Sequence, residues 1–369
     1  MLKSSFHLKN RLKKNKSNKS ALSEKDGISP PEIIGEKAIS NILEKRKKQP
    51  TVSDLIAGIL KGDISTLSRA ITLIESKNPK HLDKATQVIK GCLPHANKSV
   101  RIGITGVPGV GKSTFIEAFG KHLIDKNKKV AILAVDPSST ITKGSIMGDK
   151  TRMANLVKEP NAYIRPSASG DSLGGVARKT RETIILCEAA GFDTILIETV
   201  GVGQSETTVH SMVDFFLLLK LAGAGDELQG IKRGIIEMAD AIVINKADGD
   251  NIKRAKLAKI EFTRALHLYP LKESSWTPKV SLCSAIDNKG IDEVWKMIAA
   301  YIALSEENGF FTKKRQDQNK YWLLQTIEEH LKYEFYTNPK INKELQNQLK
   351  LIEQAKTTPF AAAEFLLNL

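Results

Sequence analysis

One glycine-rich stretch has the residue order of a phosphate-binding loop, G-x-x-x-x-G-K-[S/T]. It consists of Gly106, Val107, Pro108, Gly109, Val110, Gly111, Lys112, Ser113 and Thr114. Glycines allow a tight turn whose successive N–H groups point at phosphate oxygens, and a helix that begins there adds a favourable dipole. The lysine can reach the β- and γ-phosphates, and the serine hydroxyl can ligate Mg²⁺. The pattern predicts a site for a nucleoside triphosphate and Mg²⁺.

The elements on either side of this stretch must position it. An apolar run, Val100 to Thr105, leads into the loop, and a helix-forming run, Ser113 to Ile124, leaves it. A glycine-rich turn without a ligand is the alternative interpretation. The strand–loop–helix order favours the nucleotide site, because it places the backbone N–H groups at a helix N-terminus.

A second motif, Asn245-Lys246-Ala247-Asp248, indicates which base is bound. The carboxylate of Asp248 can accept two hydrogen bonds from guanine, and adenine has no such pair of donors, so the site selects against ATP. Lys246 can lie over the base, and Asn245 can join this loop to the phosphate loop. After the next apolar run, Ser284-Ala285 either supplies a backbone N–H to the guanine oxygen or forms an ordinary turn.

Two carboxylates follow apolar runs where metal-directed acids are found. Glu198 ends the run that includes Ile195–Ile197, and Asp136 follows Val130–Val135. Such acids face the ligand crevice of a parallel sheet and can hold Mg²⁺ through water. Gly201 stands where a backbone N–H would contact the γ-phosphate. Val202 stands where Ras-like proteins have a water-positioning Gln, so intrinsic hydrolysis should be slow, and Gln204 is only a candidate for that role.

Short apolar runs alternate with helical stretches over residues 98–308. This order predicts an α/β fold of the P-loop NTPase type, a mostly parallel central sheet flanked by helices. We expect four segments: a basic tail and linker over 1–50, a helical N-terminal segment over 51–97, the P-loop GTPase domain over 98–308, and a helical arm over 309–369. The arm either forms a homodimer or packs onto its own domain.

Composition narrows the class. The chain has 369 residues, of which 41% are hydrophobic and 26% charged, with a net charge of +15. It contains no run of eighteen apolar residues, so we expect no membrane span. Cys92, Cys187 and Cys283 lie far apart, which argues against a disulfide framework and suits a reducing compartment. We expect a cytoplasmic location, with the mitochondrial matrix as the alternative.

The basic tail accounts for much of the positive charge. Its first twenty residues hold seven lysines and arginines and no acid. A solvated extension is the preferred interpretation, although such a tail could contact nucleic acid, a membrane or an acidic partner, and we expect no nucleic-acid partner. A mitochondrial transit peptide would be richer in arginine.

With these motifs the chain resembles the MeaB/ArgK family, the G proteins that accompany methylmalonyl-CoA mutase. Besides the phosphate loop, the resemblance depends on the stretches 136–139, 148–153, 173–177, 198–206 and 223–232. It implies a homodimeric GTPase of the SIMIBI type that uses GTP to gate adenosylcobalamin delivery to the mutase and to protect it. It implies that Asp136, Asp149 and Glu198 surround Mg²⁺, and that Lys232 couples the partner to hydrolysis.

The resemblance also implies which residues act in hydrolysis: Lys112, Asp136, Glu198 and Lys232. Segments 136–153, 198–210 and 223–233 look like nucleotide-responsive switches. Lys143 stands where a glycine is common, which leaves the geometry of the first switch open. Two other functions are weighed: a kinase linked to basic amino-acid transport, and a nickel-insertion GTPase. The N-K-x-D motif argues against the first, and the absence of clustered His or Cys in the sequence near the nucleotide motifs argues against the second.

Overall fold

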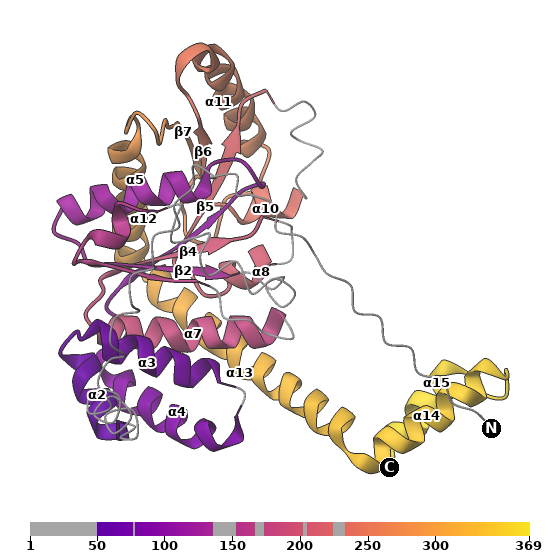
Figure 1. The fold of residues 1–369 in the computed structure, drawn as a ribbon. Coiled ribbons are helices and arrows are strands. Elements are labelled where there is room, and N and C mark those ends of the chain that lie inside the picture. Colours follow the sequence, from indigo (N-terminus) through magenta and orange to yellow (C-terminus); the bar gives the residue numbers. More distant parts are fainter. Residues whose placement is uncertain (1–49, 77, 136–152, 167–172, 202–204, 224–232) are drawn as a thin grey trace, which may run out of the picture. The chain divides into compact units, whose positions relative to one another are not determined.

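The computed structural model describes residues 50–76, 78–135, 153–166, 173–201, 205–223 and 233–369. Its centre is a seven-stranded sheet in the order β3-β2-β4-β1-β5-β6-β7, and all paired strands are parallel (Figure 1). The strands are β1 Val100–Thr105, β2 Val130–Val135, β3 Ala162–Arg165, β4 Thr194–Thr199, β5 Phe215–Leu221, β6 Ala241–Asn245 and β7 Lys279–Leu282. The predicted α/β fold with a mostly parallel sheet is confirmed.

The central strands are apolar because both faces of the sheet are covered. On one face, Ile102 and Ile104 of β1 lie in a core with α5 (Lys112–Asp125) and α12 (Ile291–Glu307). On the other face, Gly103 is so closely covered that an added Cβ would lie 2.9 Å from the Phe216 ring. A side chain at position 103 would therefore force the layers apart.

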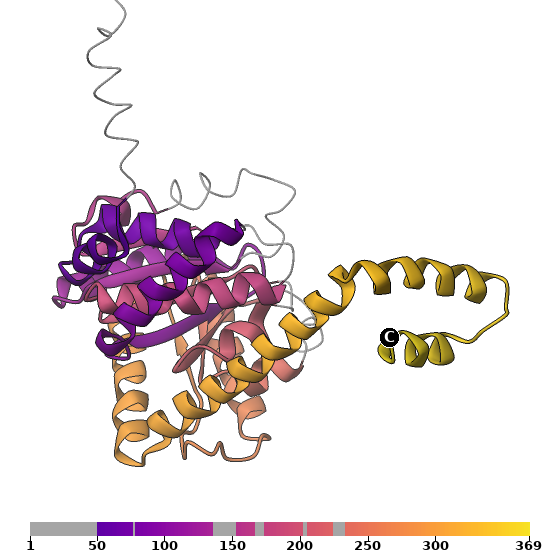
Figure 2. The same cartoon turned by 90° about the horizontal axis from the view of Figure 1, so that it is seen from below.

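The helices α7 (Leu173–Ala189), α8 (Ser205–His210) and α10 (Arg233–Met238) lie on that second face. Three further helices pack against α7 and share its hydrophobic core (Figure 2): α2 Val52–Leu60, α3 Ile64–Glu75 and α4 Pro79–Cys92. Their starts are fixed by capping side chains, including a capping box in which Thr51 and Asp54 bond each other's backbone N–H groups.

The remaining elements are α11 Ile252–Leu266, the long α13 Phe310–Thr337, α14 Pro339–Glu353, α15 Pro359–Leu367, and the short 3₁₀ turns η1 Leu93–His95, η3 Leu156–Lys158 and η4 Gly249–Asn251. Proline at the first position of α14 and of α15 fixes where each helix starts. No helix among the described residues is both long and apolar enough to cross a bilayer.

The amino edge of the sheet is tied together by buried ion pairs. Asp214, just before β5, accepts hydrogen bonds from Arg315 Nε and Nη2 of α13 at 2.8 and 2.7 Å. The same carboxylate accepts the backbone N–H of Arg101 at 2.8 Å. The Arg101 guanidinium in turn donates to Glu188 of α7 at 2.8 and 3.0 Å. These bonds join β1, α7 and the first turns of α13 into one unit.

Farther along α13, apolar residues face solvent. Tyr321, Leu324, Ile327 and Leu331 recur at helical spacing on this predicted arm, and all four side chains are exposed in the described chain. The first part of the helix is attached to the domain, where Gln318 Nε2 donates to Val213 O and Trp322 Nε1 donates to Ser211 O.

Candidate nucleotide site

The predicted nucleotide motifs that are described gather at the carboxyl edge of the sheet. The phosphate loop follows β1, Glu198 and Gly201 lie at the end of β4, and the guanine-type loop follows β6. Since β4 is the neighbour of β1, with Glu198 level with Ile104, the acid lies beside the start of the loop. Parallel strands place their carboxyl ends together, which is where ligands bind in open α/β sheets.

The backbone of the phosphate loop needs its glycines. Gly109 and Gly111 have φ of +83° and +92°, in the left-handed region that side chains disfavour. At Gly111 an added Cβ would also lie 2.8 Å from Asn245 Nδ2. Because α5 begins immediately afterwards at Lys112, the loop ends with N–H groups at a helix N-terminus, as an anion site requires.

Lys112 is buried and its ammonium lies between two loops. Nζ donates to Gly106 O at 2.8 Å, to Val200 O at 3.2 Å and to Val107 O at 3.4 Å. Gly201 has φ +90°, and a Cβ there would overlap Gly106 O. The end of β4 and the phosphate loop are therefore in direct contact, and the lysine joins them. An anion on the loop would meet a positive charge that is already held in place.

Two side chains next to the phosphate loop, Ser113 and Glu198, offer oxygen atoms that could ligate Mg²⁺. The Ser113 hydroxyl lies 3.2 Å from Glu198 Oε1, so a hydroxyl and a carboxylate, both oxygen ligands, lie side by side. Among the described residues no group of three His, Cys, Asp or Glu side chains forms a metal cage. The predicted ligands Asp136 and Asp149, and the predicted Lys232 and Gln204, lie outside the described residues.

The guanine-type loop is bonded to the phosphate loop twice. Asn245 Nδ2 donates to Val110 O at 2.9 Å, and Lys246 Nζ donates to Gly109 O at 2.9 Å. Asn245 Oδ1 is buried and has no hydrogen-bond partner within the described ranges. Lys246 itself has φ +55°, an unusual conformation for a residue with a side chain, and Asn251 Nδ2 caps its carbonyl at 2.7 Å.

Asp248 is positioned by the loop after β7. The Ser284 hydroxyl donates to Asp248 Oδ2 at 2.6 Å, which leaves Oδ1 on the other side of the carboxylate. The backbone N–H of Ser284 donates to Lys289 O at 2.9 Å, so this N–H is already used. Of the predicted pair, Ala285 is therefore the residue whose N–H is the better candidate for the guanine oxygen.

The sequence motifs did not single out three polar residues at the ends of β1 and β4 and in α8: Thr105, Thr199 and Glu206. Thr199 at the end of β4 donates from its hydroxyl to Thr105 Oγ1 at the end of β1, at 2.8 Å. Glu206 in α8 is buried, and its Oε1 lies 3.5 Å from Thr105 Oγ1. Glu206 follows a glycine-rich stretch in the sequence, and an acidic residue in such a place is usually expected to be exposed to solvent. Its burial could therefore be seen only in the structure.

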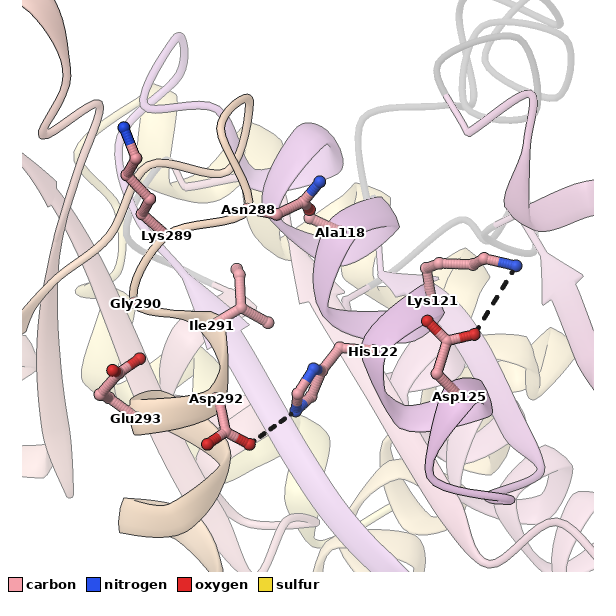
Figure 3. A pocket seen from close by; sticks show the side chains of 10 residues that line it. All are labelled: Ala118, Lys121, His122, Asp125, Asn288, Lys289, Gly290, Ile291, Asp292 and Glu293. Carbon is pink, nitrogen blue, oxygen red and sulfur yellow. Dashed lines mark ion pairs between the residues drawn. The ribbon is translucent and has the colours of Figure 1, made fainter.

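A separate hollow lies between α5 and the start of α12 (Figure 3). Two pairs of its polar side chains lie close together: His122 Nε2 lies 3.2 Å from Asp292 Oδ1, and Lys121 Nζ lies 3.8 Å from Asp125 Oδ1. Hydrogen bonds from Lys296 and Lys126 lower the pKa of Asp292 to about 2. None of the phosphate-loop residues 106–113 lines this hollow, so it is distinct from the nucleotide site.

Comparisons with known proteins agree with this geometry. Residues 67–340 match the sequence model of the family described as methylmalonyl Co-A mutase-associated GTPase MeaB. The GTPase ArgK of Escherichia coli is 43% identical over 311 residues, which cover 84% of this chain and 94% of that protein. The mitochondrial methylmalonic aciduria type A homolog of Mus musculus is 43% identical over 332 residues, covering 87% and 80% respectively.

A solved structure has the same fold. The crystal structure described as a LAO/AO transport system kinase superposes with a TM-score of 0.71 at 37% identity. The match covers 87% of this chain and 98% of that one. The likeness therefore extends well beyond the phosphate loop and includes the helices on both sides of the sheet.

Proposed function

This protein is a GTPase of the MeaB family, and from that identity we propose that it is a Mg²⁺-dependent chaperone of a cobalamin-dependent acyl-CoA mutase. In this role, binding and hydrolysis of GTP control the loading of adenosylcobalamin and protect the mutase. The observation that carries the proposal is the pairing of a phosphate loop with Asp248 held by Ser284, in a chain whose family is named for its association with that mutase.

We assign the phosphates to the loop that runs from Gly106 to Thr114. Lys112, now bonded to backbone carbonyls, would exchange one or more of them for β- and γ-phosphate oxygens. Gly201 would offer its N–H to the γ-phosphate, because it touches the loop at Gly106. Loss of the γ-phosphate would then release the end of β4, which continues into the proposed switch 198–210.

We assign the base to the loops after β6 and β7. Asp248 would accept from the guanine N1–H and amino group through its two carboxylate oxygens, with Oδ2 also accepting from Ser284, and the Ala285 N–H would meet the guanine oxygen. Lys246 and Asn245 hold this loop against the phosphate loop. Adenine would leave the half-buried Asp248 carboxylate without the pair of donors that guanine supplies, so ATP should bind poorly.

Mg²⁺ would be held by the Ser113 hydroxyl and, through water, by Glu198, with Asp136 and Asp149 as further proposed ligands. When bound, the ion would neutralise charge on the phosphate oxygens. Lys112 would stabilise the charge that builds up during transfer, and Lys232 is proposed to couple the partner to this step. Because Val202 replaces the Gln of Ras-like proteins, we expect slow turnover until the partner binds.

We further propose that the protein acts as a homodimer through α13–α15. The exposed apolar side chains of these helices include Leu324, Ile327, Leu331, Phe360 and Leu367. Such a density of apolar surface on a helical arm is typical of an interface rather than of a solvated helix. We propose a cytoplasmic location, as for a bacterial enzyme.

The test is a pull-down with the full-length protein loaded either with GDP or with a non-hydrolysable GTP analogue. Purified methylmalonyl-CoA mutase should be retained, with an affinity that differs between the two nucleotides. The variant Asp248→Asn, which should bind guanine nucleotides weakly, is mixed with the same nucleotides at the same protein concentration and serves as the control for the nucleotide requirement. If the protein retained no mutase with either nucleotide, the mutase would not be its partner and the proposal would be contradicted.

A further inference from the structure

The helix that follows the guanine-type loop has two different faces. Its inner face packs on β6 and β7 (Figure 1) and consists of Ala255, Ala258, Phe262 and Leu266. Successive residues of a helix are about 100° apart, so the outer face can be derived from the same spacing. It is a band about 100° wide, here called the α11 stripe: Lys253, Lys256, Leu257, Ile260 and Arg264.

The centre of the α11 stripe is apolar and exposed. Leu257 is 61% exposed and Ile260 is 49% exposed. Leu268, just past the C-cap residue His267, is 87% exposed. A helix that faces only water has polar residues on its outer side, and isolated apolar side chains there need no explanation. Aliphatic side chains one turn apart in the middle of the outer row are instead the arrangement of an interface core.

The rim of the α11 stripe is cationic. The helix contains five basic residues and one acidic residue, Glu261, which lies on the flank next to Leu257 and opposite Lys256. Among the described residues no carboxylate forms an ion pair with Lys253, Lys256 or Arg264. A partner that covers the two aliphatic side chains would therefore bring its own rim against three positive charges, and acidic residues are the complement that these charges select.

The helix α11 that carries the stripe also contacts the loops around the nucleotide site. Asn251 at the start of the helix donates to the carbonyl of Lys246 in the guanine-type loop at 2.7 Å. Arg254 packs over Gly223 at the end of β5, since a Cβ on that glycine would lie 3.3 Å from Arg254 Cδ. A protein bound to the stripe would thus contact α11, the helix that contacts both the guanine-type loop and the end of the segment after β5.

We propose that the α11 stripe is a docking surface for an acidic amphipathic helix of a partner protein. The partner's apolar row packs on Leu257 and Ile260, and its flanking carboxylates meet Lys253, Lys256 and Arg264. An anionic bilayer would also attract these charges. A protein helix fits better, because the apolar centre of the stripe consists of two aliphatic side chains and offers no aromatic residue for insertion among lipid headgroups. The proposal does not depend on which mutase the GTPase serves.

The test uses the full-length, GDP-loaded protein and a fluorescein-labelled peptide of leucine, glutamate and alanine. Leucines at i, i+3, i+4 and i+7 with glutamates on both sides make the peptide an acidic amphipathic helix. Fluorescence anisotropy should saturate with the wild-type protein. The variant K253E/K256E/R264E should bind at least about tenfold more weakly, and L257S/I260S should weaken binding by a similar factor.

A matched control separates docking from general attraction between opposite charges. The variant K61E/K80E/K90E makes the same change in net charge on exposed lysines of the N-terminal helices and should bind the peptide like the wild type. A peptide with lysine in place of glutamate should not bind. The proposal is overturned if both stripe variants bind normally, if the control loses as much affinity as the charge reversal, or if vesicles of phosphatidylglycerol bind where the peptide does not.

Discussion

The two edges of the sheet use buried charge in opposite ways. At the amino edge, Asp214 and Glu188 receive guanidinium and backbone donors from Arg315 and Arg101 at 2.7 to 3.0 Å. At the carboxyl edge, Lys112 is held by carbonyl oxygens, and Asn245 Oδ1 has no hydrogen-bond partner among the described residues. One edge completes its charges within the chain, and the other leaves polar atoms suited to a ligand.

This difference separates stability from function. A buried charge that has lost its partner is costly, so the amino edge should be sensitive to any truncation of its ion pairs. The carboxyl edge instead contains glycines with positive φ, such as Gly109 and Gly111, a backbone conformation that lets the loop point its N–H groups at an anion. Variants at the two edges should therefore fail in different assays.

The largest effect is expected for Lys112→Ala at the carboxyl edge. Loss of the ammonium would remove the charge that we propose faces the transferring phosphate, and kcat should fall by about 10³-fold. The midpoint of urea unfolding should change little. Phosphate release under saturating GTP measures the effect, and Lys121→Ala on the exposed side of the same helix is the control. Turnover equal to that of the wild type would remove this lysine from the mechanism.

The reverse behaviour is expected for Arg315→Leu at the amino edge. The change leaves the Asp214 carboxylate buried without its guanidinium, which should lower the free energy of unfolding by about 3–5 kcal/mol. The folded fraction should still bind GDP. Urea denaturation measures the change against Lys313→Ala, which removes only an exposed pair with Glu273. If both variants unfolded at the same urea concentration, the amino edge would not be the stabilising one.

Base selection should change with Asp248→Asn. The amide offers a donor where guanine also presents one, so GTP affinity should fall by about 10- to 100-fold while xanthosine triphosphate gains affinity. Competition against a fluorescent GDP analogue measures both. The neighbouring exposed acid Asp250 gives the control variant Asp250→Asn. Unaltered preference for guanine in the first variant would contradict the assignment of the base.

The smallest effect concerns pH at the amino edge. Burial, assisted by the charge of Lys314, lowers the pKa of His210 to about 4 from an ordinary value of 6.5. Between these values the unfolded chain binds a proton that the native state excludes, so stability should fall as the pH drops through this window, by at most about 1.4 kcal/mol per pH unit. His210→Phe should flatten the slope.

The ring exchange keeps the edge-on contact with Phe216, so it removes titration with little loss of packing. His330→Phe, on the exposed part of α13, is the matched control and should leave the pH dependence of unfolding unchanged. An identical slope in wild type and His210→Phe would show that other groups account for the acid sensitivity.

Local patterns predicted the fold class and the positions of the loops well. The phosphate loop depends on a short string of glycines and a lysine, and the central strands depend on apolar runs that need no distant partner. Strand β3 does not stand out as an apolar run, because Ala162–Arg165 is four residues long, lies at the sheet edge and mixes polar with apolar side chains. The phosphate loop after β1 was therefore easier to predict than the edge strand β3 of the same sheet.

Contacts between distant residues could not be predicted in this way. Arg315 and Asp214 are far apart in the sequence, and each alone looks like an ordinary surface charge. Ser284 matched a base-contacting motif, but its N–H is used by Lys289 in a bridge that only the folded loop reveals. The roles proposed for Asp136, Asp149 and Lys232 remain predictions, because these residues lie outside the described ranges.

Isothermal titration calorimetry of the full-length protein with GTP, GDP and ATP in the presence of Mg²⁺ tests the central claim most directly. The account predicts saturable binding of both guanine nucleotides, little or no heat with ATP, and loss of the GTP signal in Asp248→Asn but not in Arg315→Leu at a temperature where that variant is folded. Binding of ATP as tight as that of GTP, or no binding of either guanine nucleotide, would contradict it.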